Sequence, residues 1–263
     1  MKSFKERLLV GAIILSVTLS VILSSSRLLL FLFVLVLSSL EIVELFHCLD
    51  PSKTGRNHWI MLIGNALFQF CAYLAVPELQ LAVAVLFFMY LFVLSVVHPY
   101  REFEDLFITL FVSIYISFFS SFTLNFPAVK QNYLLLILCV SWGTDTFAYL
   151  TGFFFGKTPL TEISPKKTRE GAIGGLIGAI LLSLLLRPFF YISLSADKVF
   201  LIALAGSIAA QVGDLFASRL KRKMNIKDFG TLLKAHGGIM DRFDSVQFAL
   251  PTVWLMVRIF TKH

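Results

Sequence analysis

The chain has 263 residues, of which 57% are hydrophobic and only 15% are charged, and its mean hydropathy is +0.83. These values exclude an ordinary soluble globular domain and predict an all-α, polytopic integral membrane protein. Basic residues outnumber acidic ones by 23 to 16, and the three scattered cysteines are too few to form a disulfide framework.

About nine stretches are long and apolar enough to span a membrane as helices of about 17 to 25 residues. Each is a continuous apolar run, which favours helices over a barrel because a helix satisfies its backbone groups internally. The first run follows a basic N-terminus and no small-residue cleavage site, so we expect it to be retained as a span. The expected spans centre on 8–25, 28–46, 58–76, 80–97, 104–123, 132–155, 171–190, 198–217 and 245–260.

The distribution of basic residues predicts how the chain is oriented. With the N-terminus inside, most of the 23 lysines and arginines fall in cytoplasmic segments, as the positive-inside rule requires. We therefore expect a multi-pass protein of the cytoplasmic (inner) membrane whose polar site faces the cytoplasm. The exceptions are Arg27, Lys130, Arg187, Lys198, Arg258 and Lys262.

The first half, residues 1–125, is expected to be an N-terminal transmembrane region. It is aliphatic and rich in phenylalanine, and its otherwise unexplained apolar surface suggests a role as scaffold or as the contact of a homodimer. Glu41 and Glu44 are exceptions, three residues apart near the end of a span. An interfacial position is favoured over a functional intramembrane pair, and neither is assigned a catalytic role.

The second half, residues 126–263, is expected to be the catalytic transmembrane region. Its first span contains "SWGTDTFAYLTGFFFGK", with Asp145 in the middle of an apolar segment and one helical turn from Ser141 and Tyr149. A carboxylate at that depth must be partnered or face a water-filled cavity, and by default it marks a functional site. A structural aspartate, hydrogen-bonded to neighbouring helices, remains the alternative.

The stretch "GKTPLTEISPKKTREGAIGG", residues 156–175, reads as a loop that leads into a glycine-rich helix start. Its ammonium and hydroxyl groups suit phosphate oxygens, although the spacing is not that of a P-loop. The glycines at 171, 174 and 175 permit close approach of either a phosphate or a neighbouring helix. The candidate phosphate ligands are Lys157, Ser164, Lys166, Lys167 and Thr168.

Asp214, in "QVGDLFASRLKRK", is a second carboxylate in an apolar context. Arg219, Lys221 and Arg222 follow it within about two helical turns. A solvated helix end on the cytoplasmic side would account for this basic run, but it would not account for Asp214.

The stretch "KAHGGIMDRFDS", residues 234–245, gathers the most polar chemistry. Asp241 and Asp244 lie on one side of a helix that begins near Ile239. Gly237 and Gly238 form a tight turn before it, whose amides offer donors. The paired acids would repel each other unless a cation lay between them, and hard oxygen ligands suit magnesium. Structural salt bridges with the basic run remain the alternative.

Acidic positions beside two basic clusters are what a metal-dependent phosphoryl or nucleotidyl transferase requires. Metals bridge phosphate oxygens, and cationic side chains offset charge that develops in the transition state. The four candidate acids are Asp145, Asp214, Asp241 and Asp244.

The segment "SRLKRKMNIKDFGTLLKAHGGIMDRFDS", residues 218–245, resembles the signature of the phosphatidate cytidylyltransferase (CDP-diacylglycerol synthase) family. It carries S-x-x-K-R, then K-D, then H-G-G-x-x-D-R-x-D. The elements "DTFAYLTGFFFGK", "SPKKTREGAIGG" and "GDL" are similar to that family in kind and order, so the resemblance covers Asp145 to Ser245. Ala217 stands where family members commonly have a glutamate.

The resemblance implies that the phosphate of phosphatidic acid attacks the α-phosphorus of CTP, giving CDP-diacylglycerol and pyrophosphate. It implies a nucleotidyltransferase with magnesium, and a monovalent cation such as potassium beside it. The expected partners are CTP and membrane phosphatidic acid. No nucleic-acid partner is expected. Asp214 and Asp241 are expected to be metal ligands. Asp145 and Asp244 are expected to support the site, either as further ligands or next to the ligands. The expected phosphate contacts also include Arg219, Lys221, Arg222, Gly237, Gly238 and Arg242.

Three alternatives stay open at this point. His236 contacts a phosphate or acts as a base, or else it merely orders the glycine turn. A CTP-dependent polyprenol or phytol kinase would need a similar polytopic frame and basic loop. A cation transporter would use Asp145 and Asp214 as pathway carboxylates, but few acids, such as Glu78 and Asp197, are expected on the outer face.

Overall fold

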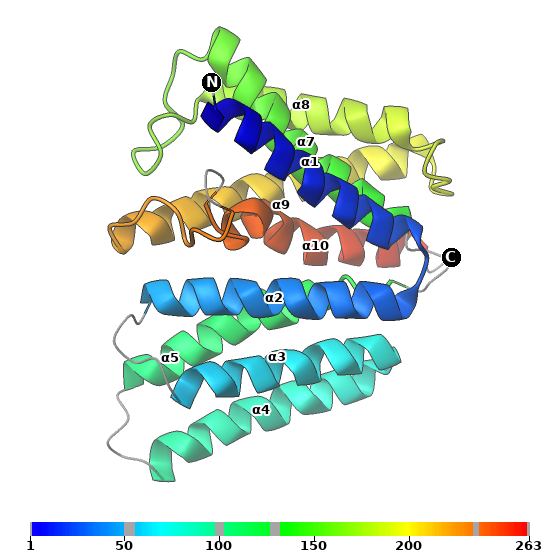
Figure 1. Ribbon diagram of the computed structural model, residues 1–263. Helices are drawn as coiled ribbons and strands as arrows, with labels where there is room; N and C mark the ends of the chain where they lie inside the picture. Colours follow the sequence, from blue (N-terminus) through cyan, green and yellow to red (C-terminus); the bar gives the residue numbers. More distant parts are fainter. Residues whose placement is uncertain (1, 50–55, 98–102, 127–131, 234–236, 262–263) are drawn as a thin grey trace. The chain divides into compact units, whose positions relative to one another are not determined.

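The computed structural model describes the chain except for short gaps (Figure 1). Within the described ranges the protein is helical and has no β-strand, only one isolated bridge between Pro159 and Thr168. The all-α prediction is confirmed. Each expected span overlaps a helix or, for residues 104–123, a run of three helical segments. The described ranges are 2–49, 56–97, 103–126, 132–233 and 237–261.

The chain forms two compact units. The first unit comprises Met1–Ala128 and Phe229–Met240, and the second comprises Val129–Asp228 and Asp241–His263. The first break in sequence lies close to residue 125, where the sequence changes character. The short segment Phe229–Met240, however, belongs to the first unit, whose helices lie about 100 residues or more before it in the sequence.

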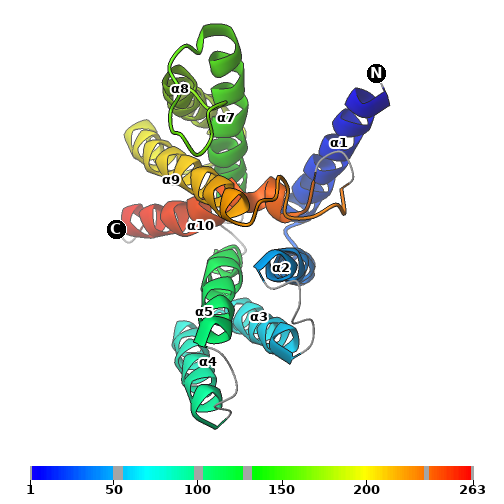
Figure 2. The same ribbon diagram turned by 90° about the vertical axis from the view of Figure 1, so that its left-hand side faces the viewer.

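The first unit is a group of helices around an aromatic core. The α2 helix packs against α3, and α3 packs against α4 and the helical stretch that begins with α5 (Figure 2). Phe68 of α3 meets Phe87 and Leu91 of α4 in a buried cluster. Its helices are α1 (Lys2–Leu23), α2 (Arg27–Leu49), α3 (Arg56–Leu74), α4 (Pro77–Val97), α5 (Phe103–Val112), the π-helix η1 (Ser113–Phe118) and α6 (Phe119–Ser121).

Neutral polar groups bond to one another inside this unit. The Gln69 side-chain amide donates to the carbonyl of Ser117 in the π-helix and to Ser120 Oγ, both at 3.1 Å. The Asn65 amide donates to Ser38 Oγ at 2.8 Å. Amide and hydroxyl bonds of this kind tie apolar helices together where water is absent.

The second unit contains α7 (Asn132–Phe155), α8 (Arg169–Leu186), α9 (Ala196–Lys223) and all but the first residue of α10 (Met240–Phe260). Glycines let α8 lie directly on α7. A Cβ added at Gly171 would lie 2.8 Å from the carbonyl oxygen of Ala148, and one at Gly175 would lie 2.9 Å from that of Thr144. Of the two roles open for these glycines, the structure therefore shows close helix packing.

Among the described residues, five helices are long and apolar enough to cross a membrane, namely α2, α4, α7, α8 and α9. Leu9–Leu23, His58–Leu74 and Leu106–Ser121 form shorter apolar helices. This composition supports a multi-pass membrane protein. The expected count of about nine spans is larger than the five that meet this measure.

Candidate functional site

The second unit holds a cavity of about 750 Å³. Its walls come from α7, α8, α9, α10 and the loop at residues 156–168 that joins α7 to α8. Stretches that are distant in sequence therefore converge on one space. The expected site residues that line it are Asp145, Ser164, Lys166, Lys167, Thr168, Asp214, Lys221, Asp241, Arg242 and Asp244.

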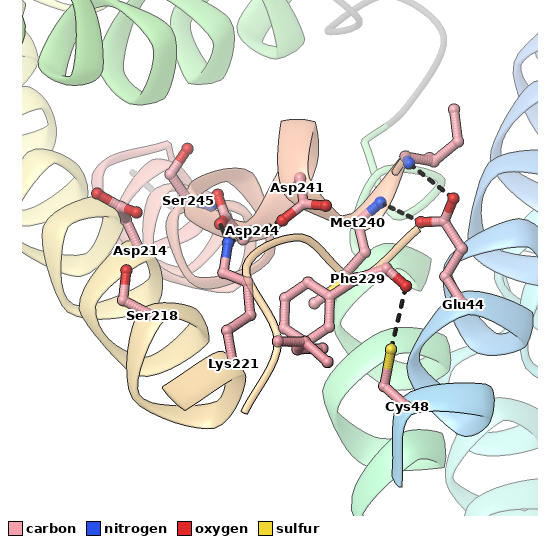
Figure 3. Close-up of polar contacts among 12 residues, drawn as sticks. Glu44, Cys48, Asp214, Ser218, Lys221, Phe229, Met240, Asp241, Asp244 and Ser245 are labelled. Carbon is pink, nitrogen blue, oxygen red and sulfur yellow. Dashed lines mark hydrogen bonds and ion pairs between the residues drawn. The ribbon is translucent and has the colours of Figure 1, made fainter. Parts of the chain in front are cut away.

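Lysine ammonium groups contact three of the four expected carboxylates. Lys167 Nζ, from the loop, forms an ion pair with Asp214 of α9. Lys221 Nζ lies 2.8 Å from Asp241 Oδ1 and 3.8 Å from Asp244 Oδ2, and Figure 3 shows its side chain directed at these acids. The Asp241 side chain is only 2% exposed, against 31% for Asp214. A buried carboxylate needs such a partner, because removal from water strongly disfavours an isolated charge.

Ser245 joins Asp145 of α7 to α10. Its hydroxyl donates to Asp145 Oδ2 at 2.9 Å, and its backbone N–H donates to Asp244 Oδ1 at 2.8 Å. Ser245 is fully buried. Two acids from α7 and α10 are thus fixed through one serine. The sequence motif ends at this residue but predicts no role for it.

The basic loop is closed at its base by hydrogen bonds. Thr168 caps α8, since its Oγ1 accepts from the N–H of Gly171 at 3.0 Å. The Glu170 carboxylate accepts from the N–H groups of Lys157 and Thr158 at 3.1 and 3.2 Å. The N–H of Leu160 donates to the carbonyl of Lys167 at 2.7 Å. This closure holds the lysines at 166 and 167 beside the cavity.

Several expected phosphate ligands do not line the cavity. Lys157, Arg219 and Arg222 are exposed and lie outside its lining. Gly237 and Gly238 belong to the segment grouped with the first unit, where Gly237 has a φ of 77°. His236 lies outside the described residues.

The cavity is also lined by residues for which the sequence motifs predicted no role. Gln211, one turn before Asp214, lines it and donates through Nε2 to the carbonyl of Ala172 at 3.1 Å. Tyr149 and Phe153 line it too, with stacked rings 6.3 Å apart, and are 70% and 71% exposed. Helical spacing is the signal that could have found them, because Asp145, Tyr149 and Phe153 recur every four residues.

The arrangement can bind anions and cations side by side. Ammonium groups of the loop and of α9 can meet phosphate oxygens, and the aspartates offer hard oxygen atoms of the kind that magnesium prefers. In the part of the chain that the structure describes, no three His, Cys, Asp or Glu side chains cluster closely enough to form a metal-ligand group. The four carboxylates nevertheless border one cavity.

Comparison with known proteins extends the match across nearly the whole chain. A sequence model described as the Cytidylyltransferase family matches residues 5–260. The phosphatidate cytidylyltransferase of Bacillus subtilis (strain 168) is 38% identical over 138 residues, which are 52% of this chain and 51% of that protein. The one of Staphylococcus haemolyticus (strain JCSC1435) is 42% identical over 127 residues, 48% of this chain and 49% of that protein.

A plant protein gives a similar result. The chloroplastic phosphatidate cytidylyltransferase 5 of Arabidopsis thaliana is 40% identical over 126 residues, 48% of this chain and 32% of that protein. The matched stretch thus spans about half the length, or less, of these relatives.

Proposed function

Because the chain belongs to the Cytidylyltransferase family, we propose that it transfers CMP from CTP to phosphatidic acid and is a nucleotidyltransferase of phospholipid biosynthesis. The observation that carries the proposal is the cavity that Asp145, Asp214, Asp241 and Asp244 border together with Lys167 and Lys221. The relatives named phosphatidate cytidylyltransferase support the choice of lipid acceptor.

In the proposed reaction, a phosphate oxygen of phosphatidic acid attacks the α-phosphorus of CTP. The bond from that phosphorus to the β-phosphate bridging oxygen breaks, and its electron pair leaves with pyrophosphate. Chemistry of this type depends on positioning and charge stabilisation rather than on a protein nucleophile. Lys166, Lys167 and Arg242 border the cavity and would bind the phosphates.

The donor set suits magnesium, because the four expected aspartates border one cavity and offer hard oxygen atoms. Asp214 and Asp241 would hold the ion, with Asp145 and Asp244 in support and a monovalent cation such as potassium nearby. Bound magnesium supplies charge neutralisation for the triphosphate and for the departing pyrophosphate. Lys221 and Lys167 keep the carboxylates paired and directed into the cavity.

A lipid substrate requires access from the side of the bilayer. Tyr149 and Phe153 favour such a route, since both line the cavity and both are mostly exposed on a helix apolar enough to span. A phosphate could then lie among the lysines while its acyl chains pass over these rings. The polar cavity alone would serve a soluble acceptor equally well.

We also propose that the chain crosses the inner membrane about nine times, with its N-terminus in the cytoplasm. The cavity would then open to the cytoplasm. The bias of basic residues toward one side supports this orientation. A homodimer through the first unit is part of the same proposal, and cross-linking in lipid that found only monomers would remove it.

The proposal is tested by pyrophosphate release from the purified protein in detergent. CTP, phosphatidic acid and magnesium are supplied together and then omitted one at a time. We expect release only when all three are present, with a CDP-lipid as the second product. No release from folded protein under the complete condition would contradict the proposal. Release of CDP when a polyprenol replaces phosphatidic acid would indicate a lipid kinase.

A further inference from the structure

The α2 helix holds both ends of the segment Phe229–Met240, and all of these contacts lie within the first unit. At one end, Cys48 Sγ donates to the carbonyl of Phe229 at 3.0 Å. At the other, the Glu44 carboxylate accepts from the N–H of Ile239 at 3.0 Å and from that of Met240 at 2.9 Å (Figure 3). Glu44 and Cys48 are one helical turn apart, so one face of α2 makes both attachments.

The segment is shaped to receive the Glu44 carboxylate. A Cβ added at Gly230 would lie 2.5 Å from Glu44 Oε1, and one at Gly238 would lie 2.7 Å from the same atom. Gly237 has a φ of 77°, a backbone conformation that disfavours other residues. Three glycines therefore make room for one acidic side chain and for the turn around it.

This contact lies at the N-terminus of α10. The first N–H groups of a helix have no partner within it, and the N-terminus carries a partial positive charge that favours a carboxylate. The capping group here comes from another helix, 195 positions earlier in the chain. Met240 is the first residue of α10, and Asp241 is the next residue of the same helix.

We infer that Glu44 is a positioning residue for the reaction: its carboxylate anchors the first turn of α10 and so sets the direction of the Asp241 and Asp244 side chains. This inference rests on the proposed function, because it gives Glu44 a role only through acids that serve that chemistry. The Asp241 side chain is 2% exposed and bonded to Lys221 at 2.8 Å, so a small rotation of the first turn would displace a tightly bound group. Displacements of about 1 Å can reduce rates on the order of a hundredfold.

The test compares Glu44→Gln with the wild type. The amide keeps the size of the side chain, but it places a donor against one of the two backbone N–H groups. We expect kcat to fall by about tenfold or more. Glu78→Gln is the matched control, because Glu78 is an exposed carboxylate in the first turn of α4, and it should leave turnover unchanged.

Hydrogen exchange gives a readout that does not depend on catalysis. Amides of the peptide at residues 237–246 should exchange faster in Glu44→Gln than in the wild type, whereas peptides of α8 should not change. Wild-type turnover together with unchanged exchange would overturn the inference. If the wild type itself makes no CDP-lipid, the proposed function fails, while the exchange comparison still decides whether Glu44 anchors the turn.

A second variant covers the case in which Glu44→Gln does not fold. Gly230→Ala retains Glu44 but pushes a methyl group against its carboxylate. We expect this variant to lower kcat and to accelerate exchange in the same peptide. Normal turnover in folded Gly230→Ala, with Glu44 displaced, would contradict the inference.

Discussion

The two units treat polar groups in apolar helices in opposite ways. In the first unit, neutral amides and hydroxyls satisfy one another, as Gln69 does with Ser117 and Ser120. In the second unit, charged groups border a cavity, as Asp214 and Lys221 do. Charges at membrane depth are costly, whereas neutral hydrogen bonds are a modest stabilising link. Under the proposed function, we therefore expect substrate chemistry in the second unit, where charged groups border a cavity.

One short segment joins the two units along the chain. Phe229–Met240 lies between two stretches of the second unit in sequence, but it belongs to the first unit, where it is hydrogen-bonded to Glu44 and Cys48. Through Glu44, the first unit would bear on catalysis. Substitutions in each unit test this division of roles.

The largest effect is expected from Asp241→Asn. The change keeps the shape but removes a buried negative charge from the cavity, so CMP transfer should fall by about a hundredfold or more while the protein still folds. Turnover of the purified variant in detergent measures this. Asp197→Asn, on an exposed acid in the first turn of α9, is the control and should be close to silent. Near-normal turnover in Asp241→Asn would place the chemistry elsewhere.

Lys221→Met should have the next largest effect. It removes the ammonium group from Asp241 and Asp244, which then repel each other at 2% and 9% exposure. Breaking such a pair costs about 3–5 kcal/mol, so both Tm and turnover should fall. Added magnesium should restore part of the lost Tm, because a cation would again separate the acids.

Lys223→Met is the control for this prediction, since Lys223 is an exposed neighbour at the end of the same helix. An equal loss of Tm in both variants would indicate that net charge, and not pairing with the two acids, stabilises this region.

A smaller effect is expected from Glu170→Gln. The change weakens the bonds to Lys157 and Thr158 that close the basic loop. The KM for CTP should rise by about threefold to tenfold, with little change in kcat, because the lysines at 166 and 167 lose their fixed positions. Steady-state kinetics measure both constants. Glu162→Gln, on an exposed acid of the same loop, should leave KM unaltered, and an equal rise there would refute the closing role.

The smallest effect on catalysis is expected from Gln69→Leu. Loss of its hydrogen bonds in the first unit should lower Tm by a few degrees and leave kcat within about twofold of the wild type. Ser95→Ala is the control, because the Ser95 hydroxyl donates to the carbonyl of Phe92 in its own helix. A collapse of kcat at unchanged Tm would break the division between the two units.

Local sequence patterns account for much of the fold. Continuous apolar runs predict the helices because each helix satisfies its own backbone groups, and helical spacing brings Asp241 and Asp244 to one side. The motifs also supply Asp214, Lys167 and Lys221, which the structure brings to one cavity. Their roles as metal and phosphate ligands stay predictions.

Contacts between distant segments could not be predicted in the same way. The sequence places Glu44 near the end of a span, where an interfacial position explains it well enough. Only the folded chain shows its carboxylate on the N–H groups of Ile239 and Met240. Likewise, the glycines of α8 suit a phosphate or a helix equally well until the carbonyl oxygen of Thr144 is seen beside Gly175.

The most direct measurement follows the position of the transferred phosphorus. CTP labelled with ³²P at the α-phosphorus, and in parallel CTP labelled at the γ-phosphorus, is incubated with the protein, phosphatidic acid and magnesium. The lipid is then extracted and counted, with Asp241→Asn as the blank. We predict label in the lipid from α-labelled CTP only. Label in the lipid from γ-labelled CTP would contradict CMP transfer and would show a kinase instead.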